Sequence, residues 1–416
     1  MHIFITICGD KMKRVFLIIL IIIFNMSINA FADVNIDSDE NYIDIGLFYG
    51  GSAKSSVTLT CYGNAQTINA ADVETSVRYD SDGIIAVDGK EYRGSIILSK
   101  DGSGLLTVIN RVNMEDYISS VIAVEMSPSF NLEALKAQAV CARTYAIKNR
   151  GKHSKYGFDL CTTEDCQVYR GVSAESEKCT RAANETEGLV ITYNGAIIDA
   201  VYSATSGGWT EDVENVWGSE IPYLCAVEDK YESKDVYGSS WSKEISVSEA
   251  TEIMDKKGYG LGTVNNIQVV SATEHGAVTE LKVTGTQGEK VFKKENCRLA
   301  FGTATLSQAF SVTPVYESTA KADVIYFHSG QEIPGKISVL SADGIREISA
   351  QGVFLKGNTE KEYYANANAS VKGFKFEGRG YGHLVGMSQN GANGMASAGY
   401  MYDEILKHYY KGIEIS

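Results

Sequence analysis

Residues 131–148 read NLEALKAQAVCARTYAIK, and this stretch decides the class of fold. After Asn131, a residue suited to cap a helix, it contains five alanines and neither glycine nor proline. Four apolar residues recur at helical spacing and form one face of small side chains: Leu135, Ala139, Ala142 and Ala146. The pattern predicts a helix over residues 132–148 that packs closely against its neighbours.

A second helix is expected just before it, over about residues 114–125. Asn113 is a capping residue three positions before Asp116. Four apolar residues then share one helical face: Tyr117, Ile118, Val121 and Ile122. Short β-like runs separated by turn residues lie on both sides of the helices. We therefore expect an α+β fold with a β-rich N-terminal domain, a mixed domain holding the two helices, and a β-rich inserted lobe.

The first residues have the layout of a secretory signal. Basic residues precede an unbroken apolar run from Val15 to Phe24, and Ala30-Phe31-Ala32 offers a cleavage site. Ten apolar residues are too few to cross roughly 30 Å of hydrocarbon. The pattern predicts an exported, extracytoplasmic protein, with an uncleaved N-terminal membrane anchor as the alternative. The expected division is signal 1–32, β-rich domain 33–100, mixed region 101–229, inserted lobe 230–372, and return to the mixed domain 373–416.

Composition excludes one class of partner and one kind of disulfide-rich fold. The 416 residues include 38 Lys and Arg against 52 Asp and Glu, for a formal charge of -14, and no basic run stands out. Nucleic acid is therefore excluded as a partner. Beyond the signal, seven cysteines at irregular spacing remain. An odd number in so long a chain is not the disulfide framework of a small secreted domain.

Glu125 is the first candidate for chemistry. It follows apolar residues at a helix end, and Pro128 breaks the backbone just after it. A carboxyl among apolar neighbours tends to have a raised pKa, as a general acid near neutral pH requires. The alternative is a surface glutamate at the end of an amphipathic helix. On the next helix, Lys136 and Arg143 are two turns apart and share a face.

A loop of hydroxyls and glycines runs from Tyr202 to Thr210. Such a loop can hydrogen-bond sugar hydroxyls, and Trp209 or Trp217 can stack on a sugar ring. The alternative is an ordinary glycine turn with solvated hydroxyls. The serines here lack a G-x-S-x-G elbow, which argues against a hydrolase-type nucleophile.

His153, Cys161 and Cys166 have the spacing of metal ligands in a loop. Two thiolates and an imidazole suit Zn²⁺, with a fourth ligand from water or elsewhere. A local disulfide between the two cysteines is a rival reading, and two unrelated free thiols are a third.

Several long, ordered motifs together resemble the family of stage II sporulation protein D and the amidase enhancers, over roughly residues 105–230 and 373–414. The motifs are VIAVEM (121–126), LKAQAVCARTY (135–145), SGG (206–208), VWG (216–218) and GYGHLVGMSQNG (380–391). The family consists of bacterial cell-wall proteins, and its sporulation members are lytic transglycosylases that cut glycan strands already stripped of peptides by an amidase.

The resemblance implies that Glu125 is the catalytic acid/base and that Lys136 and Arg143 are the family's basic positions. It favours zinc at His153, Cys161 and Cys166, in a structural role, since the chemistry requires no cofactor. Peptidoglycan glycan strands and a cell-wall amidase are the implied partners. The residues we expect to bind the glycan are Lys136, Arg143, Tyr202, Ser203, Ser206, Thr210, His383, Ser388 and Gln389.

The resemblance also leaves a second function open, namely a non-catalytic glycan-binding protein that stimulates an amidase. Two departures from the family pattern keep this second function open. The family usually has glycine where this chain has Leu384, and often has histidine at or near Ser203. Glycine takes a positive φ that leucine resists.

Overall fold

The computed structural model describes residues 30–31, 41–81, 83–316, 336–341, 344–349 and 370–416. They form two compact units. The first comprises the described residues up to 202 together with 222–225 and 386–416, and the second the described residues within 203–221 and 226–385. The fold is α+β, as expected. The two units divide the chain differently from the expected domains, whose boundaries near residues 100, 230 and 372 stay predictions.

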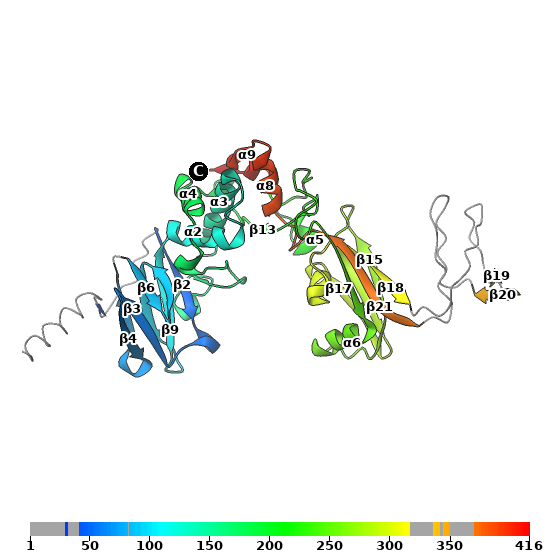
Figure 1. Ribbon diagram of the computed structural model, residues 1–416, viewed down its shortest axis with the longest axis horizontal. Helices are drawn as coiled ribbons and strands as arrows, with labels where there is room; N and C mark the ends of the chain where they lie inside the picture. The colour runs from blue at the N-terminus through cyan, green and yellow to red at the C-terminus, as the bar shows by residue number, and fades with distance from the viewer. Residues whose placement is uncertain (1–29, 32–40, 82, 317–335, 342–343, 350–369) are drawn as a thin grey trace, which may run out of the picture. The chain divides into compact units, whose positions relative to one another are not determined.

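The first unit contains two larger sheets, drawn in blue and cyan in Figure 1. One has the strand order β1-β5-β8-β9-β2-β10 and the other β4-β3-β6-β7. The bounds are β1 Ala30–Phe31, β2 Tyr42–Phe48, β3 Ser56–Cys61, β4 Asn64–Asn69, β5 Ser76–Tyr79, β6 Ile84–Val87, β7 Lys90–Arg93, β8 Ser95–Lys100, β9 Leu106–Asn113 and β10 Leu160–Cys161. A third, small sheet has the order β12-β11-β23 (Ala196–Ile197, Ile191–Tyr193, Glu414–Ile415).

The two key helices form where the sequence predicts them. Helix α2 is Met114–Glu125 and α3 is Leu132–Lys148. Asn113 and Asn131 cap them, each side chain accepting a hydrogen bond from a backbone N–H of the first turn. The small-residue face of α3 is fully buried. Around α3 pack α2, α4 (Glu177–Glu185), α8 (Gln389–Ser397) and α9 (Tyr402–Tyr409).

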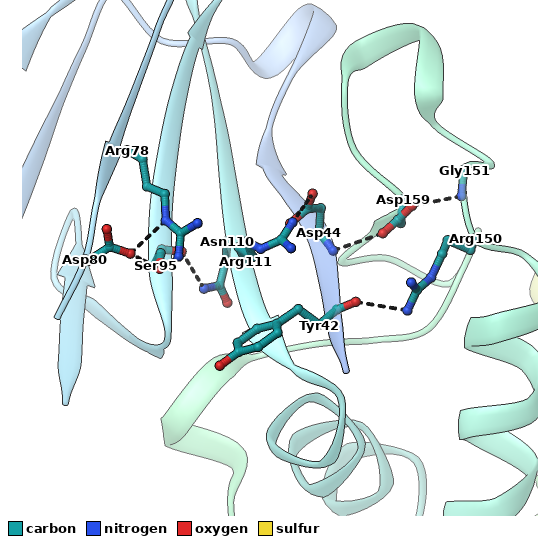
Figure 2. A network of polar contacts seen from close by, with 10 residues as sticks. All are labelled: Tyr42, Asp44, Arg78, Asp80, Ser95, Asn110, Arg111, Arg150, Gly151 and Asp159. Atoms are coloured by element: carbon teal, nitrogen blue, oxygen red, sulfur yellow. Dashed lines mark hydrogen bonds and ion pairs between the residues drawn. The ribbon is translucent and has the colours of Figure 1, made fainter. Parts of the chain in front are cut away.

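A polar network ties the large sheet to the loop that follows α3 (Figure 2). The Asp159 carboxylate accepts hydrogen bonds from the backbone N–H groups of Asp44 on β2 and Gly151 in the loop, at 3.1 and 3.0 Å. Arg111 on β9 pairs with Asp44, and Arg150 donates to the Tyr42 carbonyl. Loop 149–159 is thus bonded to strand β2 near each of its two ends.

The second unit is mainly β and has a core of its own. Its sheets have the orders β14-β21-β18 and β15-β16-β17, with the hairpin β19-β20 besides. Phe374, Phe376 and Phe301 are fully buried in the core. The bounds are α5 Val213–Val216, β14 Ser240–Ser246, α6 Val247–Lys256, β15 Val264–Ala272, β16 Val278–Gly285, β17 Gly288–Lys293, α7 Glu295–Leu299, β18 Phe310–Tyr316, β19 Lys336–Ser341, β20 Gly344–Ser349 and β21 Val371–Arg379. The chain passes from the first unit to the second within β13 (Tyr202–Ser203), and β22 (Met387–Ser388) belongs to the first unit.

Leu384 adopts the conformation that leucine resists. Its φ is +67°, a left-handed backbone that costs an L residue roughly 1–2 kcal/mol. Its side chain is buried and its carbonyl accepts the Glu211 N–H at 2.8 Å. Leu384 therefore keeps the positive φ that glycine adopts easily, and the backbone does not move to the negative φ that leucine prefers.

The expected signal lies outside the described residues, apart from Ala30–Phe31, which pair with β5. Among the residues that the structure describes, none of the helices has the length and apolar character needed to cross a membrane.

Candidate functional site

Glu125 is the last residue of α2, where the chain leaves the helix. Met126 is already extended (φ -129°, ψ 149°), and its N–H closes the last turn on the Ile122 carbonyl. The apolar side chains of Val121 and Ile122, before Glu125, are buried, whereas Ser127 and Pro128, after it, are exposed. The carboxyl is consequently held at the edge of a rigid element and is only partly open to solvent.

Two donors approach the Glu125 carboxylate. The Val168 N–H donates to Oε1 at 3.5 Å, and the Gln389 side-chain amide donates as well. Burial nevertheless raises the pKa of Glu125 above its usual range, outweighing these hydrogen bonds, and the nearby charge of Glu164 adds to the rise. A carboxyl in this state is suited to give up a proton near neutral pH.

A relay of buried polar groups lies beside this carboxyl. Tyr117 donates to Gln167 Oε1 at 3.1 Å, and Gln167 Nε2 donates to the Tyr202 hydroxyl at 3.0 Å. Loss of hydration raises the pKa of Tyr202 well above its usual range, and the charge of Glu125 raises it further. Tyr202, an expected glycan-binding residue, is therefore a neutral hydroxyl close to Glu125. Sequence reasoning missed Gln167 and Val168, which lie in a loop without a motif of their own.

The raised pKa of Glu125 predicts a dependence of stability on pH. The folded state holds this proton more tightly than the unfolded chain, whose glutamates titrate near about 4.3. The unfolding free energy therefore falls as pH rises from the unfolded pKa to the raised folded pKa. We expect Glu125→Gln to be more stable than the wild type at pH 7, with the difference vanishing at low pH.

Urea unfolding of both proteins from pH 3 to 8 measures this difference. Glu164→Gln is the control, because Glu164 is exposed and its loss should leave stability nearly unchanged. A wild type as stable as Glu125→Gln at pH 7 would contradict the burial that we describe.

The two basic positions on α3 are engaged by acids of the same unit. Lys136 Nζ lies 2.8 Å from Glu133 and 2.6 Å from Glu185. Arg143 is 1% exposed and pairs through two nitrogens with Glu115. The guanidinium also donates to the Leu189 and Ala183 carbonyls. In this structure the donors of Arg143 join α2, α3 and α4, and its expected contact with glycan stays a prediction.

The polar groups of the loop around Ser206, which belongs to the second unit, form hydrogen bonds with other residues of that unit. The N–H groups of Ser206 and Gly207 donate to the Glu232 carboxylate at 2.7 and 2.8 Å, and the Ser206 hydroxyl donates to Asp229 at 2.8 Å. The Thr210 hydroxyl accepts the Val227 N–H at 2.8 Å. Ser203, Ser206 and Thr210 are all buried. Contacts of Ser206 or Thr210 with sugar hydroxyls would require these internal bonds to be exchanged.

The aromatic candidates of the second unit differ in exposure. Trp209 stacks on His275 at 4.0 Å, which covers one ring face. Trp217 is 43% exposed, and its indole N–H donates to Glu295. His383 lies 5.0 Å from the Trp217 ring. Of the two tryptophans, Trp217 therefore offers the more open surface for a sugar.

The last two expected residues, Ser388 and Gln389, belong to the first unit. Ser388 caps α8 by accepting the Gly391 N–H at 3.1 Å. Gln389, the first residue of that helix, is the donor to Glu125 described above.

The expected metal ligands do come together. Cys166 Sγ lies 3.3 Å from His153 Nε2, and Cys161 belongs to the same cluster. A fourth group, Asp165, completes it: its Oδ2 lies 3.2 Å from His153 Nε2 and 4.0 Å from Cys161 Sγ. The four ligand atoms are all within 4.8 Å of one another. The spacing argument missed Asp165, although it directly precedes Cys166.

The surroundings hold these groups in place. The His153 ring stacks on Phe158 and lies near Tyr49, at 5.2 and 5.7 Å between ring centroids. Both cysteines are thiols in this structure. Burial raises the pKa of Cys166 to about 12. Burial also acts to raise the pKa of Cys161, but hydrogen bonds from Thr163 and Cys166 bring it below its usual value.

Comparison with known proteins identifies the family. The model of the stage II sporulation protein family matches residues 102–193, and that of a domain of unknown function matches residues 227–330. Stage II sporulation protein D of Bacillus subtilis is 31% identical over 74% of this chain and 76% of its own length. The amidase enhancer of the same bacterium is 32% identical over 91% of this chain.

The chain therefore belongs to the family of stage II sporulation protein D and the amidase enhancers, as its motifs predict. Stage II sporulation protein D of Bacillus amyloliquefaciens is 28% identical over 74% of the chain. The chain spans about half the length of the amidase enhancer, 51%.

Proposed function

We propose that this protein is an exported lytic transglycosylase that cuts denuded peptidoglycan strands during sporulation or cell-wall remodelling. The observation that carries the proposal is the Glu125 carboxyl, which is partly buried at the end of α2 with its pKa raised by burial. Family membership supports the choice of substrate class.

One carboxyl is enough for this reaction. Ordinary glycosidases use two, one acting as nucleophile or as base for water. Here the C6 hydroxyl of N-acetylmuramic acid is the nucleophile. Protonated Glu125 gives its proton to the glycosidic oxygen as the C1–O bond breaks. The resulting carboxylate then takes the C6 hydroxyl proton as the C6 oxygen bonds to C1, which closes a 1,6-anhydro ring and restores the acid. The intramolecular nucleophile supplies much of the acceleration.

The products distinguish this reaction from hydrolysis. Purified protein incubated with denuded glycan should release fragments with 1,6-anhydro-N-acetylmuramic ends, detected by mass spectrometry as termini one water lighter than reducing ends. Reducing ends would instead identify a hydrolase, in which Glu164 would be the first candidate for the second carboxylate.

A second function is favoured by a specific observation. The relative matched over 91% of this chain bears the name amidase enhancer. In that case the protein binds glycan without cutting it and stimulates a cell-wall amidase. Wild type and Glu125→Gln would then retain glycan equally, form no new ends, and accelerate a purified amidase to the same extent.

We also propose a structural zinc ion at His153, Cys161, Asp165 and Cys166. The donor set is one that Zn²⁺ accepts, and ligands on a tetrahedral ion at bond lengths of about 2.0–2.3 Å lie roughly 3.3–3.8 Å apart. The contacts of 3.2, 3.3 and 4.0 Å within the cluster are close to this spacing. Glycosidic cleavage by Glu125 requires no Lewis acid. The role of the ion would therefore be to hold the loop after α3 in one conformation.

Elemental analysis of anaerobically purified protein should find about one zinc per chain. Retention should weaken as pH falls, because the thiolate ligands must lose their protons. Asp165→Asn should release zinc at lower chelator concentrations than the wild type, whereas Glu164→Gln, next to it, should not. No zinc, together with a Cys161–Cys166 peptide two hydrogens lighter, would identify a disulfide instead.

A further inference from the structure

Trp217, in the VWG motif, is an exposed aromatic side chain that is held in a fixed place. It follows α5 and is 43% exposed, whereas tryptophan is mostly buried in folded proteins. Its indole N–H donates to Glu295 Oε2 at 2.9 Å, and the His383 ring lies 5.0 Å away, tilted by 55°. Glu295 also pairs with Arg298 at 2.6 Å, which compensates its charge. Specific contacts therefore keep the indole at the surface, where part of it is open to a ligand.

Lys294, the residue before Glu295, places an ammonium group beside the same motif. Its Nζ donates to the Glu214 carbonyl of α5 at 2.9 Å. A Cβ added at Gly218, next to Trp217, would come within 3.0 Å of this nitrogen, so the glycine leaves room for the ammonium group. An ammonium group carries three N–H donors, and Lys294 pairs with no carboxylate within the described part of the chain. Lys294 is thus an exposed cation with donors left for an anionic ligand.

The backbone of Lys294 is strained. Its φ is +54° and its ψ is -134°, a combination that L residues rarely adopt. Four other described residues besides glycine have a positive φ, and three of them precede a glycine in a hairpin turn, where this conformation is usual: Tyr62, Asp88 and Asn194. The fourth, Leu384, follows His383. Both strained positions outside the hairpins therefore adjoin a residue that contacts the Trp217 ring, and strain retained in this way is typical of a functional site.

An aromatic ring next to a cation fits an acidic sugar. The face of an aromatic ring carries partial negative charge, which attracts the C–H groups of a sugar ring. N-acetylmuramic acid carries a lactyl carboxyl group, which the stem peptide holds as a neutral amide and which an amidase sets free as a carboxylate. A carboxylate forms charge-assisted hydrogen bonds with an ammonium group. The denuded sugar thus offers both a ring and an anion, whereas the sugar that bears a peptide offers the ring alone.

We propose that Trp217 and Lys294 form a subsite for N-acetylmuramic acid with a free lactyl carboxylate, and that this subsite makes the protein prefer denuded strands. The indole stacks on the sugar ring and the ammonium group binds the carboxylate. The subsite lies in the second unit, with Lys294 in the region that matches the domain of unknown function. The proposal rests on the proposed function for its substrate class, but it concerns binding and can be tested without cleavage.

The test measures binding by isothermal titration calorimetry, with the full chain in a Glu125→Gln background so that no strand is cut. The two probes are one denuded strand with free lactyl carboxylates and the same strand with these groups converted to methylamides, which removes the charge and keeps the rings. Lys294→Met removes the ammonium group and keeps an apolar stem. Lys293→Met is the matched control, because Lys293 is the neighbouring exposed lysine and its Nζ lies 3.9 Å from Glu280.

We expect the parent protein to bind the carboxylate strand about fivefold more tightly than the amidated strand, the upper end of what one exposed ion pair contributes. Added salt should reduce this preference. Lys294→Met should bind both strands equally, whereas Lys293→Met and Lys294→Arg should keep the preference. Trp217→Ala should weaken the binding of both strands about tenfold, because stacking does not depend on the charge of the lactyl group.

The proposal is overturned if the parent protein shows no preference, if Lys294→Met keeps it, or if Lys293→Met loses it to the same extent, since overall charge would then explain the result. Cleavage of denuded glycan by the wild type is measured separately. If the preference depends on Lys294 but the wild type cuts no glycan, the subsite stands and the transglycosylase function fails. If the wild type cuts glycan and Lys294→Met keeps the preference, the function stands and the subsite fails.

Discussion

Glu125→Gln should reduce the release of 1,6-anhydro ends from denuded glycan by a factor of about 10²–10⁴. That is the contribution expected from a positioned general acid and base. Glutamine keeps the size of the side chain and its place at the end of α2, but it can neither protonate the glycosidic oxygen nor take the C6 hydroxyl proton. Initial rates on purified glycan, with products quantified by mass spectrometry, measure the effect.

The matched control is Glu164→Gln. Glu164 is exposed and close enough to influence Glu125 electrostatically, but the proposed mechanism gives it no proton to carry. Its variant should retain most of the activity, with a lower pKa for Glu125. Activity in Glu125→Gln equal to the wild type, in a protein of unchanged fold by circular dichroism, would remove Glu125 from the mechanism. Loss of activity in both variants would indicate that a second carboxylate takes part, which contradicts the mechanism with Glu125 alone.

Arg143→Met should lower the unfolding free energy by about 3–5 kcal/mol, the usual cost of removing one partner from a buried ion pair. Without the guanidinium, Glu115 keeps a charge that has no counterion, and the carbonyls of Leu189 and Ala183 lose their donor. The result should be visible as a lower midpoint in urea unfolding at an unchanged slope.

Two comparisons separate this structural role from glycan binding. Glu115→Gln combined with Arg143→Met should recover part of the lost stability, since no unpaired charge remains. Lys136→Met should cost less, because Lys136 is 12% exposed against 1% for Arg143, and one of its two partners, Glu185, is 36% exposed. If Arg143→Met kept its stability and lost affinity for glycan, the result would support the direct contact with substrate that the family resemblance implies.

The sequence by itself determined the elements that local chemistry specifies. Helices α2 and α3 begin and end as predicted because asparagine caps, alanine content and apolar spacing all act within a few residues of one another. Motifs quoted from the sequence also indicated the family, and through that resemblance they made Glu125 the candidate acid. Helix α8 is the contrast, since Gly391 and Gly394 lower its intrinsic propensity and packing against α3 compensates.

Only the tertiary structure decided what surrounds the predicted residues. The approach of Gln389 to Gln138, the Val168 N–H at Glu125, and the carboxylate of Asp165 beside His153 join positions with no common periodicity or motif. The same is true of Arg143, whose spacing on α3 indicates a face but not what that face meets. Hydrogen bonds and ion pairs act over a few ångströms in space, so the partners of a buried charge follow from how the helices pack and not from distance along the chain.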